Sequence, residues 1–193
     1  ALVGMIWDSQ ADEFIEANEL FARTERVSYL LLGEKHDNPD HHALQLRALD
    51  HVLQTNTVST VSFEMMSSEQ QPLLQELSAY RQSSLEQINE YLQWDNEGWD
   101  WDYYAPLLHS AMQSDVLINA ANISNEEMMQ VYGAPTAAKI EGVLDEQTMA
   151  ALEKDIDESH CGMLPESQFP AMVRVQQARD FAMADSLAAS SPQ

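Results

Sequence analysis

The 193-residue sequence is poor in positive charge, and this deficiency excludes one large class of partners. Nine Lys and Arg residues stand against 32 Asp and Glu residues, which gives a formal net charge of -23 at pH 7. Binding to nucleic acid depends on basic side chains that neutralise phosphates. Between residues 37 and 138 the only such side chains are Arg47 and Arg81. We therefore expect no nucleic-acid partner.

Cysteines and long apolar runs are also scarce. Cys161 is the only cysteine, so the chain has no internal disulfide bond and no zinc site built from several thiolates. No apolar run reaches the roughly 18 residues that a membrane-spanning helix needs. Apolar residues nevertheless make up 45% of the chain, which suffices at this length for one domain with a hydrophobic core. We expect a single domain over residues 1–193.

Short apolar runs alternate with amphipathic stretches along the chain. Four runs rich in Val, Ile and Leu are typical of strands buried in a parallel sheet: Leu2–Trp7, Val27–Leu32, Val58–Phe63 and Val116–Ala121. Helices are expected at 39–54, 103–114 and 170–189, the first of them capped by Asn38 before Pro39. The alternation predicts an α/β fold with a mostly parallel sheet flanked by helices.

Residues 68–101 and 125–160 differ from the rest because they are acidic, helical in pattern and interrupted by turns. We interpret them as helical insertions that form a lid subdomain over an edge of the sheet.

Polar residues follow three of the predicted strands. Glu34 and His36 come after Val27–Leu32, while Glu64 and Asn122 come after the third and fourth strands. Ligands of open parallel sheets bind beyond the carboxyl ends of the strands, so we expect these four side chains to converge. Glu34, His36 and Glu64 could bind a divalent metal such as zinc or manganese. They could equally act as general acid and base, or form a buried hydrogen-bond network.

Three further features remain open at this point. His41 and His42 are adjacent in the first turn of a predicted helix, so they cannot both face the same crevice, and Gln45 could hold His41. The aromatic stretch 94–106 favours core packing over a wall for a flat ligand. His160, beside Cys161 and a glycine, could bind a metal or cofactor, or anchor a loop.

The string YLLLGEKHDNPDHHALQ, residues 29–45, resembles the opening motif of the ChaN-like haem-binding lipoproteins. These are related to the erythromycin esterases and the Tiki/TraB proteins. Further stretches agree in the same order: GWDWDYYAP at 98–106, HC at 160–161 and QARDFAMADSL at 177–187. The resemblance therefore covers nearly the whole chain.

This resemblance implies a parallel α/β fold with a helical subdomain, haem as the ligand and iron acquisition as the setting. It implies a homodimer that forms around haem, with a Tyr as axial ligand of the iron. Tyr104 and Tyr132 are the candidate ligands. Lys139, Lys154 and His160 are the candidate partners of the haem propionates.

The resemblance further implies an outer-membrane lipoprotein of a Gram-negative bacterium, facing the periplasm or the cell surface. A lipidated cysteine before the first residue and a further strand with a His after the last one are expectations about segments beyond these 193 residues.

We thus expect a haem-binding protein rather than an enzyme. The alternative is a metal-dependent hydrolase that uses Glu34, His36 and Glu64. A third reading is an acidic interaction module whose polar strand ends are structural.

Overall fold

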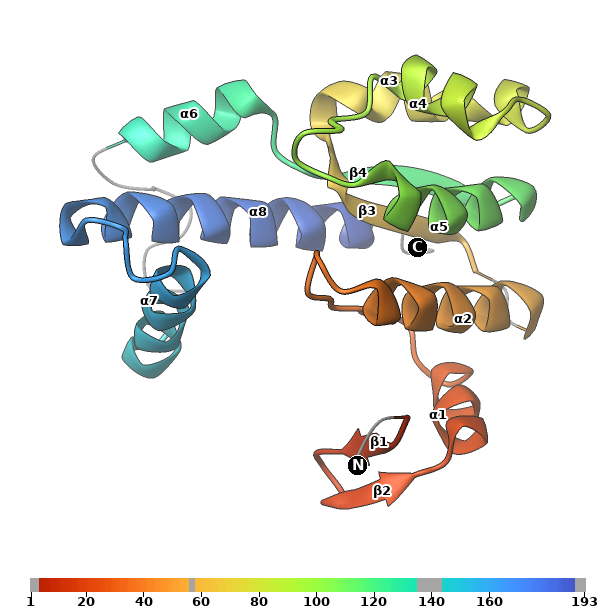
Figure 1. Cartoon of the computed structure of the whole chain (residues 1–193), viewed down its shortest axis with the longest axis horizontal. Coiled ribbons are helices and arrows are strands. Elements are labelled where there is room, and N and C mark those ends of the chain that lie inside the picture. Colours follow the sequence, from red (N-terminus) through yellow and green to blue (C-terminus); the bar gives the residue numbers. More distant parts are fainter. Residues whose placement is uncertain (1–3, 56–57, 135–143, 190–193) are drawn as a thin grey trace. The chain divides into compact units, whose positions relative to one another are not determined.

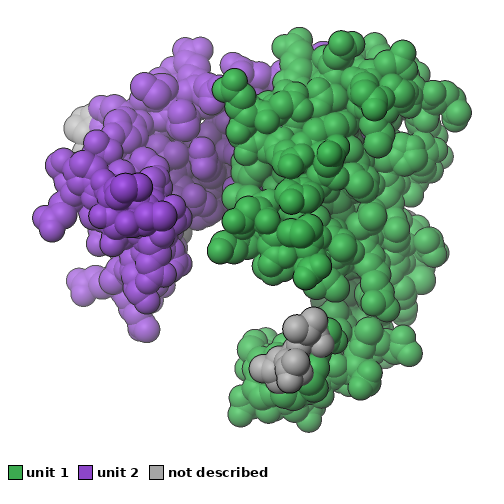
Figure 2. Space-filling model, viewed as in Figure 1, with its two compact units in different colours: residues 1–61, 77–117 green, residues 62–76, 118–193 purple. Residues whose placement is uncertain are grey.

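The structure is a computed structural model that describes residues 4–55, 58–134 and 144–189 (Figure 1). The chain divides into two compact units that are interleaved along the sequence (Figure 2). Unit 1 comprises Ala1–Val61 and Leu77–Leu117, and unit 2 comprises Ser62–Glu76 and Ile118–Gln193. Each unit thus draws on two separate stretches of the chain.

Unit 1 is mainly helical. It starts with a small antiparallel hairpin, in which β1 (Ile6–Asp8) pairs with β2 (Glu13–Ile15). Its further elements are α1 (Ala17–Thr24), α2 (Pro39–Thr55), the 3-10 helix η2 (Leu77–Tyr80), α4 (Leu85–Leu92) and α5 (Trp101–Gln113). Helix α2 packs against α1 and α5, and α4 packs against α5 (Figure 1).

The core of unit 1 is built from one face of each of these helices. Leu49 and Val52 of α2 are buried, as are Ile88 and Leu92 of α4. Helix α5 contributes most, with six buried residues: Tyr104, Ala105, Leu107, Leu108, Ala111 and Met112. Removing these apolar side chains from water is the main term that stabilises the unit.

Polar side chains fix where the helices of unit 1 begin. The side-chain oxygen of Asn38 accepts a hydrogen bond from the backbone N–H of Asp40 at 3.0 Å, at the start of α2. Ser84 and Gln87 form a reciprocal capping box at the start of α4. Each cap satisfies N–H groups that have no partner inside the helix.

Unit 2 combines the sheet with the last three long helices. Strands β3 (Thr60–Ser67) and β4 (Leu117–Asn122), whose first residues belong to unit 1, form a two-stranded parallel sheet. The other elements are η1 (Ser68–Gln70), α3 (Gln71–Gln75), α6 (Asn125–Gly133), α7 (Glu146–Ser159), η3 (Glu166–Gln168) and α8 (Phe169–Ala189). Helices α6 and α7 both pack against α8 (Figure 1).

Two polar residues join the pieces of unit 2. The side chain of Gln71, at the start of α3, accepts a hydrogen bond from the N–H of Ala120 in β4 at 2.8 Å. Glu127, in the first turn of α6, accepts from the N–H of Ser124 at 2.8 Å and from the hydroxyl of Ser68 at 3.2 Å. The bond from the Ser124 backbone is the main reason that the pKa of Glu127 is lowered.

The predicted α/β class with a parallel sheet is confirmed. The helices expected at 39–54, 103–114 and 170–189 are α2, α5 and α8. The stretches 68–101 and 125–160 are helical within the described residues, although their role as a lid stays a prediction, as does the single domain. No helix among the described residues combines the length and apolar character required to cross a bilayer.

Two strand predictions are wrong. Val27–Leu32 forms no strand, and Leu31 in its middle is 76% exposed. An apolar run becomes a strand only where a neighbouring strand shares a ladder of backbone hydrogen bonds with it, and none of the described strands pairs with this run. Of the run at residues 2–7, residues 2 and 3 lie outside the described residues, and Ile6 and Trp7 belong to β1, which pairs antiparallel with β2 rather than joining the parallel sheet. Trp7 is 50% exposed, and the ring of Phe14 packs edge-on against it with 4.8 Å between ring centroids.

Candidate functional site

A cavity of about 550 Å³ lies among the three long helices of unit 2. Its volume is in the range of small-molecule and cofactor sites. Each helix contributes residues three or four positions apart, which share one helix face. The lining residues are Met128, Met129 and Tyr132 of α6; Ile156, Ser159 and neighbouring His160 of α7; and Met172, Val175, Gln176 and Arg179 of α8.

Tyr132 supplies the phenol of this cavity. The residue is half-buried and lies in the last turn of α6. The guanidinium of Arg174 in α8 donates to the carbonyl oxygens of Val131 at 3.4 Å and Tyr132 at 3.1 Å. A cation is favourable at the C-terminal end of a helix, where carbonyls lack partners. Arg174 therefore positions the helix end that carries Tyr132.

His160 supplies an imidazole and follows the last residue of α7. Its Nδ1 lies 2.7 Å from the carbonyl oxygen of Ile156. Because a carbonyl oxygen only accepts, Nδ1 carries the proton, and in the neutral ring Nε2 is then an acceptor. The neighbouring Cys161 is exposed and does not line the cavity.

Arg179 supplies the cation. Its Nε is buried and has no hydrogen-bond partner among the described residues. Its Nη2 lies 3.8 Å from the sulfur of Met128, a weak acceptor. None of the described carboxylates forms an ion pair with it.

The two lysines predicted to bind propionates are placed differently. The side chain of Lys154 is 72% exposed, forms an ion pair with Glu158 at 3.4 Å and does not line the cavity. Lys139 lies outside the described residues. Of the predicted haem-contacting residues, the structure thus brings Tyr132 and His160 together in one cavity.

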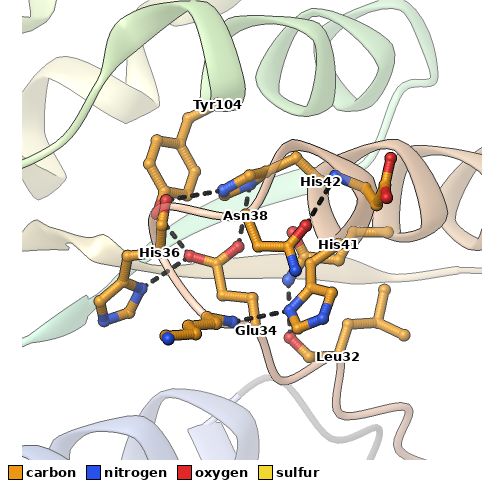
Figure 3. A network of polar contacts seen from close by, with 10 residues as sticks. Leu32, Glu34, His36, Asn38, His41, His42 and Tyr104 are labelled. Carbon is orange, nitrogen blue, oxygen red and sulfur yellow. Dashed lines mark hydrogen bonds and ion pairs between the residues drawn. The ribbon is translucent and has the colours of Figure 1, made fainter.

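A second polar site, in unit 1, centres on Glu34, whose side chain is 7% exposed (Figure 3). Its Oε1 accepts from the hydroxyl of Tyr104 and from Nδ1 of His36, the latter at 2.8 Å. Its Oε2 lies 3.0 Å from Nδ1 of His42, whose Nε2 donates to the carbonyl of His36 at 3.0 Å. We call these four residues the Glu34 network.

The contact between Glu34 and His42 is an ion pair rather than an aligned hydrogen bond, because both atoms are buried without hydrogen-bond geometry. The side chains of His42 and Glu34 are 4% and 7% exposed, so they form a buried pair of titratable groups. Removing one partner of a buried ion pair strongly destabilises the folded protein.

Two more residues of the same motif hold the loop that precedes α2. Nδ1 of His41 accepts from the N–H of Lys35 at 2.8 Å, and the side chain of Gln45 donates to the carbonyl of Leu32 at 2.9 Å (Figure 3). Both His41 and His42 thus bind the loop, each from a different side of the first turn of α2. Gln45 binds the loop and not His41.

Tyr104, the other candidate iron ligand, lies in the core of unit 1. Its side chain is 1% exposed, and its hydroxyl donates to Glu34. The surrounding aromatic residues are packed in the same way: Trp94 is 5% exposed, contacts the rings of Trp101 and Tyr104 and donates from Nε1 to the carbonyl of Trp99 at 2.8 Å. Within the aromatic stretch 94–106, Trp94 and Tyr104 therefore serve core packing.

The divalent-metal hypothesis gains no support. Glu34 and His36 lie in unit 1 and Glu64 and Asn122 in unit 2, where the amide of Asn122 donates to the carbonyl of Glu64 at 3.0 Å. Within the described ranges, no three His, Cys, Asp or Glu side chains are grouped so as to hold a metal ion. The convergence of all four side chains stays a prediction.

A wider hollow of about 770 Å³ adjoins the Glu34 network in unit 1. Its wall includes His36, Trp101 and four acidic residues: Asp37, Glu97, Asp100 and Asp102. The resulting field repels anions and disfavours a ligand with negative groups.

Sequence reasoning missed Arg179. A signal was present, because Met172, Val175, Gln176 and Arg179 recur at the spacing of one helix face. Periodicity alone, however, does not separate a cation that faces a cavity from one that faces solvent.

Comparison with known proteins agrees with the resemblance read from the sequence. No curated protein matches the chain. Among solved structures, one described as "Cofacial heme binding to ChaN of Campylobacter jejuni" matches with a TM-score of 0.82 and 25% sequence identity, over 95% of this chain and 74% of that one. The family described as "Haem-binding uptake, Tiki superfamily, ChaN" matches residues 20–193. The chain belongs to this family.

Proposed function

We propose that this protein binds haem for iron acquisition and holds it in the cavity between α6, α7 and α8. The observation that carries the proposal is the composition of this cavity, where a phenol and a guanidinium face walls of Met, Ile and Val. Membership in a haem-binding family and similarity to a haem-binding structure support it.

The residues fit the chemistry of haem. Flat apolar rings are bound well by adaptable thioether side chains, and three methionines line the cavity: Met128, Met129 and Met172. A Tyr oxygen is an established axial ligand of haem iron. When bound, haem would supply a ferric centre for that oxygen.

The acidic hollow of unit 1 is the less suitable haem site. It carries aromatic side chains, but four carboxylates border it. Haem brings two propionates, and like charges at short range in a partly desolvated site cost free energy. The cavity in unit 2 has no carboxylate among its lining residues.

Tyr132 is the proposed iron ligand. It lines the cavity, and no described group is bonded to its hydroxyl. Tyr104 has its hydroxyl bonded to Glu34 and its ring buried. Arg174 then acts as a positioning residue, since it holds the end of α6 through backbone carbonyls.

Bound haem is also proposed to bring two copies of the chain together. Met129 lines the cavity and is 63% exposed, so the cavity opens to the surface along an apolar rim. A porphyrin seated there would leave an apolar edge for a second copy to cover. We further propose that the mature protein is a lipid-anchored protein of the outer membrane of a Gram-negative bacterium, as in the family that its motifs resemble.

The test is a titration of the purified chain with hemin, followed by the Soret band, with the mass of the assembly measured at each ratio. Saturable binding and a shift from monomer to dimer are expected. Tyr132→Phe should abolish the charge-transfer bands of phenolate ligation. Tyr80→Phe is the matched control, because Tyr80 stacks on Tyr91 in unit 1 and does not line the cavity.

If wild-type protein shows no saturable Soret change, the proposed function is wrong. If hemin binds but Tyr132→Phe keeps the wild-type spectrum, haem binding stands and the assignment of the ligand is wrong. If hemin binds to a chain that stays monomeric, only the dimer is refuted.

A further inference from the structure

Arg179 is an unusual cation in a very acidic protein. The chain has 32 acidic residues and nine basic ones, so carboxylates are abundant. Arg23 pairs with Asp8 and Glu19, Arg81 with Asp115, and Lys154 with Glu158. Arg179 forms no ion pair with any described residue, as is also true of Arg26, Lys35, Arg47 and Arg174. What sets it apart is that its Nε is also buried without a hydrogen-bond partner among the described residues, at the wall of the cavity. The Nε of Arg81 lacks such a partner too, but the guanidinium of Arg81 is paired with Asp115.

Such an arrangement is unfavourable unless a ligand completes it. A guanidinium carries five N–H donors in a planar fork, and each donor removed from water without a partner costs free energy. Within the described part of the chain its one hydrogen-bond contact is the thioether of Met128, 3.8 Å from Nη2, which does not balance the charge. An anion that matches the fork, above all a carboxylate, would satisfy both the charge and the donors.

We propose that Arg179 binds a carboxylate of the porphyrin and makes the cavity selective for porphyrins with free propionates. This inference rests on the proposed function. The ligand class is thus an amphipathic ring with an acidic edge, whose apolar body lies against the methionines while its carboxylate meets the fork of Arg179.

The other cations near the cavity are less suited to this role. The Nε and Nη2 of Arg174 are already bonded to the carbonyls of Val131 and Tyr132. Lys154 is solvent-exposed and paired with Glu158. The Nδ1–H of His160 donates a hydrogen bond to the carbonyl oxygen of Ile156, so in the neutral ring no second N–H is left for a propionate. Arg179 presents a planar guanidinium fork, which matches the geometry of a carboxylate.

The experiment measures the affinity of the full chain for hemin and for hemin dimethyl ester, which has the same ring and iron but no carboxylates. The variants are Arg179→Gln and Arg179→Lys. Arg26→Gln is the control because it removes the same charge from an exposed side chain that does not line the cavity. Thermal unfolding of each ligand-free variant is recorded in parallel.

Arg179→Gln should weaken hemin binding by about ten- to a hundredfold, the worth of one or two charge-assisted hydrogen bonds. It should leave the affinity for the dimethyl ester unchanged, and wild-type protein should prefer hemin over the ester by a similar factor. The hemin affinity of Arg179→Lys should lie between those of wild type and Arg179→Gln, because Lys keeps the charge and loses the planar fork. Ligand-free Arg179→Gln should unfold at or above the wild-type temperature, since an unpaired charge has been removed.

The inference is overturned if wild-type protein binds hemin and Arg179→Gln either has no effect or weakens hemin and ester equally. It is also overturned if ligand-free Arg179→Gln unfolds at a markedly lower temperature, which would reveal a structural role. Failure of the proposed function looks different, because wild-type protein would then bind neither ligand.

Discussion

Replacement of Tyr104 by Phe separates the Glu34 network from the haem cavity. The substitution keeps the aromatic ring, which is 1% exposed and contacts the rings of Trp94, Trp99 and His42. It removes only the hydroxyl that donates to Glu34. Because no cavity forms, the loss reflects one hydrogen bond to a buried carboxylate.

The magnitude follows from that bond. A hydrogen bond to a charged partner contributes about 1.5–3 kcal/mol, and a central value of about 2 kcal/mol is reasonable here because His36 still donates to the same oxygen. For a chain of this size each kcal/mol shifts the unfolding temperature by roughly 2–4 °C, so a drop of roughly 4–8 °C is expected. The affinity for hemin, measured on folded protein, should not change.

The assay is thermal unfolding of wild type, Tyr104→Phe, Glu34→Gln and the double variant, together with a Soret titration of each. In the double-mutant cycle the two substitutions should couple, because both remove the same contact. Tyr80→Phe serves again as the control. If Tyr104→Phe unfolds at the wild-type temperature, the hydrogen bond from Tyr104 to Glu34 does not stabilise the fold and the reasoning is refuted. If it folds normally but loses the phenolate bands of bound haem, Tyr104 is the ligand and our reasoning is wrong.

Three further predictions concern stability. Ser84→Ala removes half of the capping box of α4 and should cost about 1 kcal/mol in urea unfolding, and an unchanged midpoint would contradict it. Leu92→Ala empties a fully buried position and should cost about 2–5 kcal/mol, unless the core collapses around it. The Arg23 guanidinium holds the pKa of Asp8 at about 2, below its usual 3.8. The stabilisation from this pair is therefore present above pH ~4 and is lost as pH falls towards 2. In an acid titration followed by tryptophan fluorescence, Asp8→Asn should flatten the transition between pH ~4 and pH ~2. An unaltered curve would refute the link between this ion pair and acid stability.

Helices were the most predictable part of this fold. Helix α2 begins at the predicted Pro39, after Asn38, and ends one residue beyond the prediction, while α8 runs from Phe169 to Ala189. Their signals are local, because a cap and a repeating apolar face lie within one stretch of sequence. Local information of this kind needs no knowledge of the rest of the chain.

Strands were less predictable because their stability is not local. The apolar character of Val27–Leu32 predicted burial, yet the run is exposed and forms no strand with the other described residues. The run at 58–63 did become part of β3, which pairs with β4. The two runs are similar in composition and differ in whether a partner strand is available, which single-sequence patterns do not encode.

The candidate sites show the same division. The sequence identified Glu34 and His36 as a polar cluster, and the structure brings them together, but with Tyr104 and His42 rather than with Glu64. It pointed to Tyr132 and His160, which do share a cavity, but not to Arg179. Whether a polar residue is satisfied by the fold depends on tertiary contacts, so it could not be read from spacing.

The two sites differ in whether their buried polar groups have partners within the protein, and this difference is the best guide to which site binds a ligand. Most polar groups of the Glu34 network and its loop are bonded to one another, and the buried Oε2 of Glu34 and Nδ1 of His42, which make no hydrogen bond within the described part of the chain, lie 3.0 Å apart as an ion pair, so loss of these groups should reduce stability. In the cavity, the buried Nε of Arg179 has no hydrogen-bond partner and its guanidinium no carboxylate among the described residues, so its loss should reduce binding and spare the ligand-free fold. The motif by which the family is recognised in the sequence thus serves to hold a loop, whereas the ligand binds where the fold leaves a cation without a carboxylate partner. Variants of the Glu34 network should therefore lower the unfolding temperature and keep the affinity for hemin. Variants of Arg179 should lower the affinity and keep the unfolding temperature.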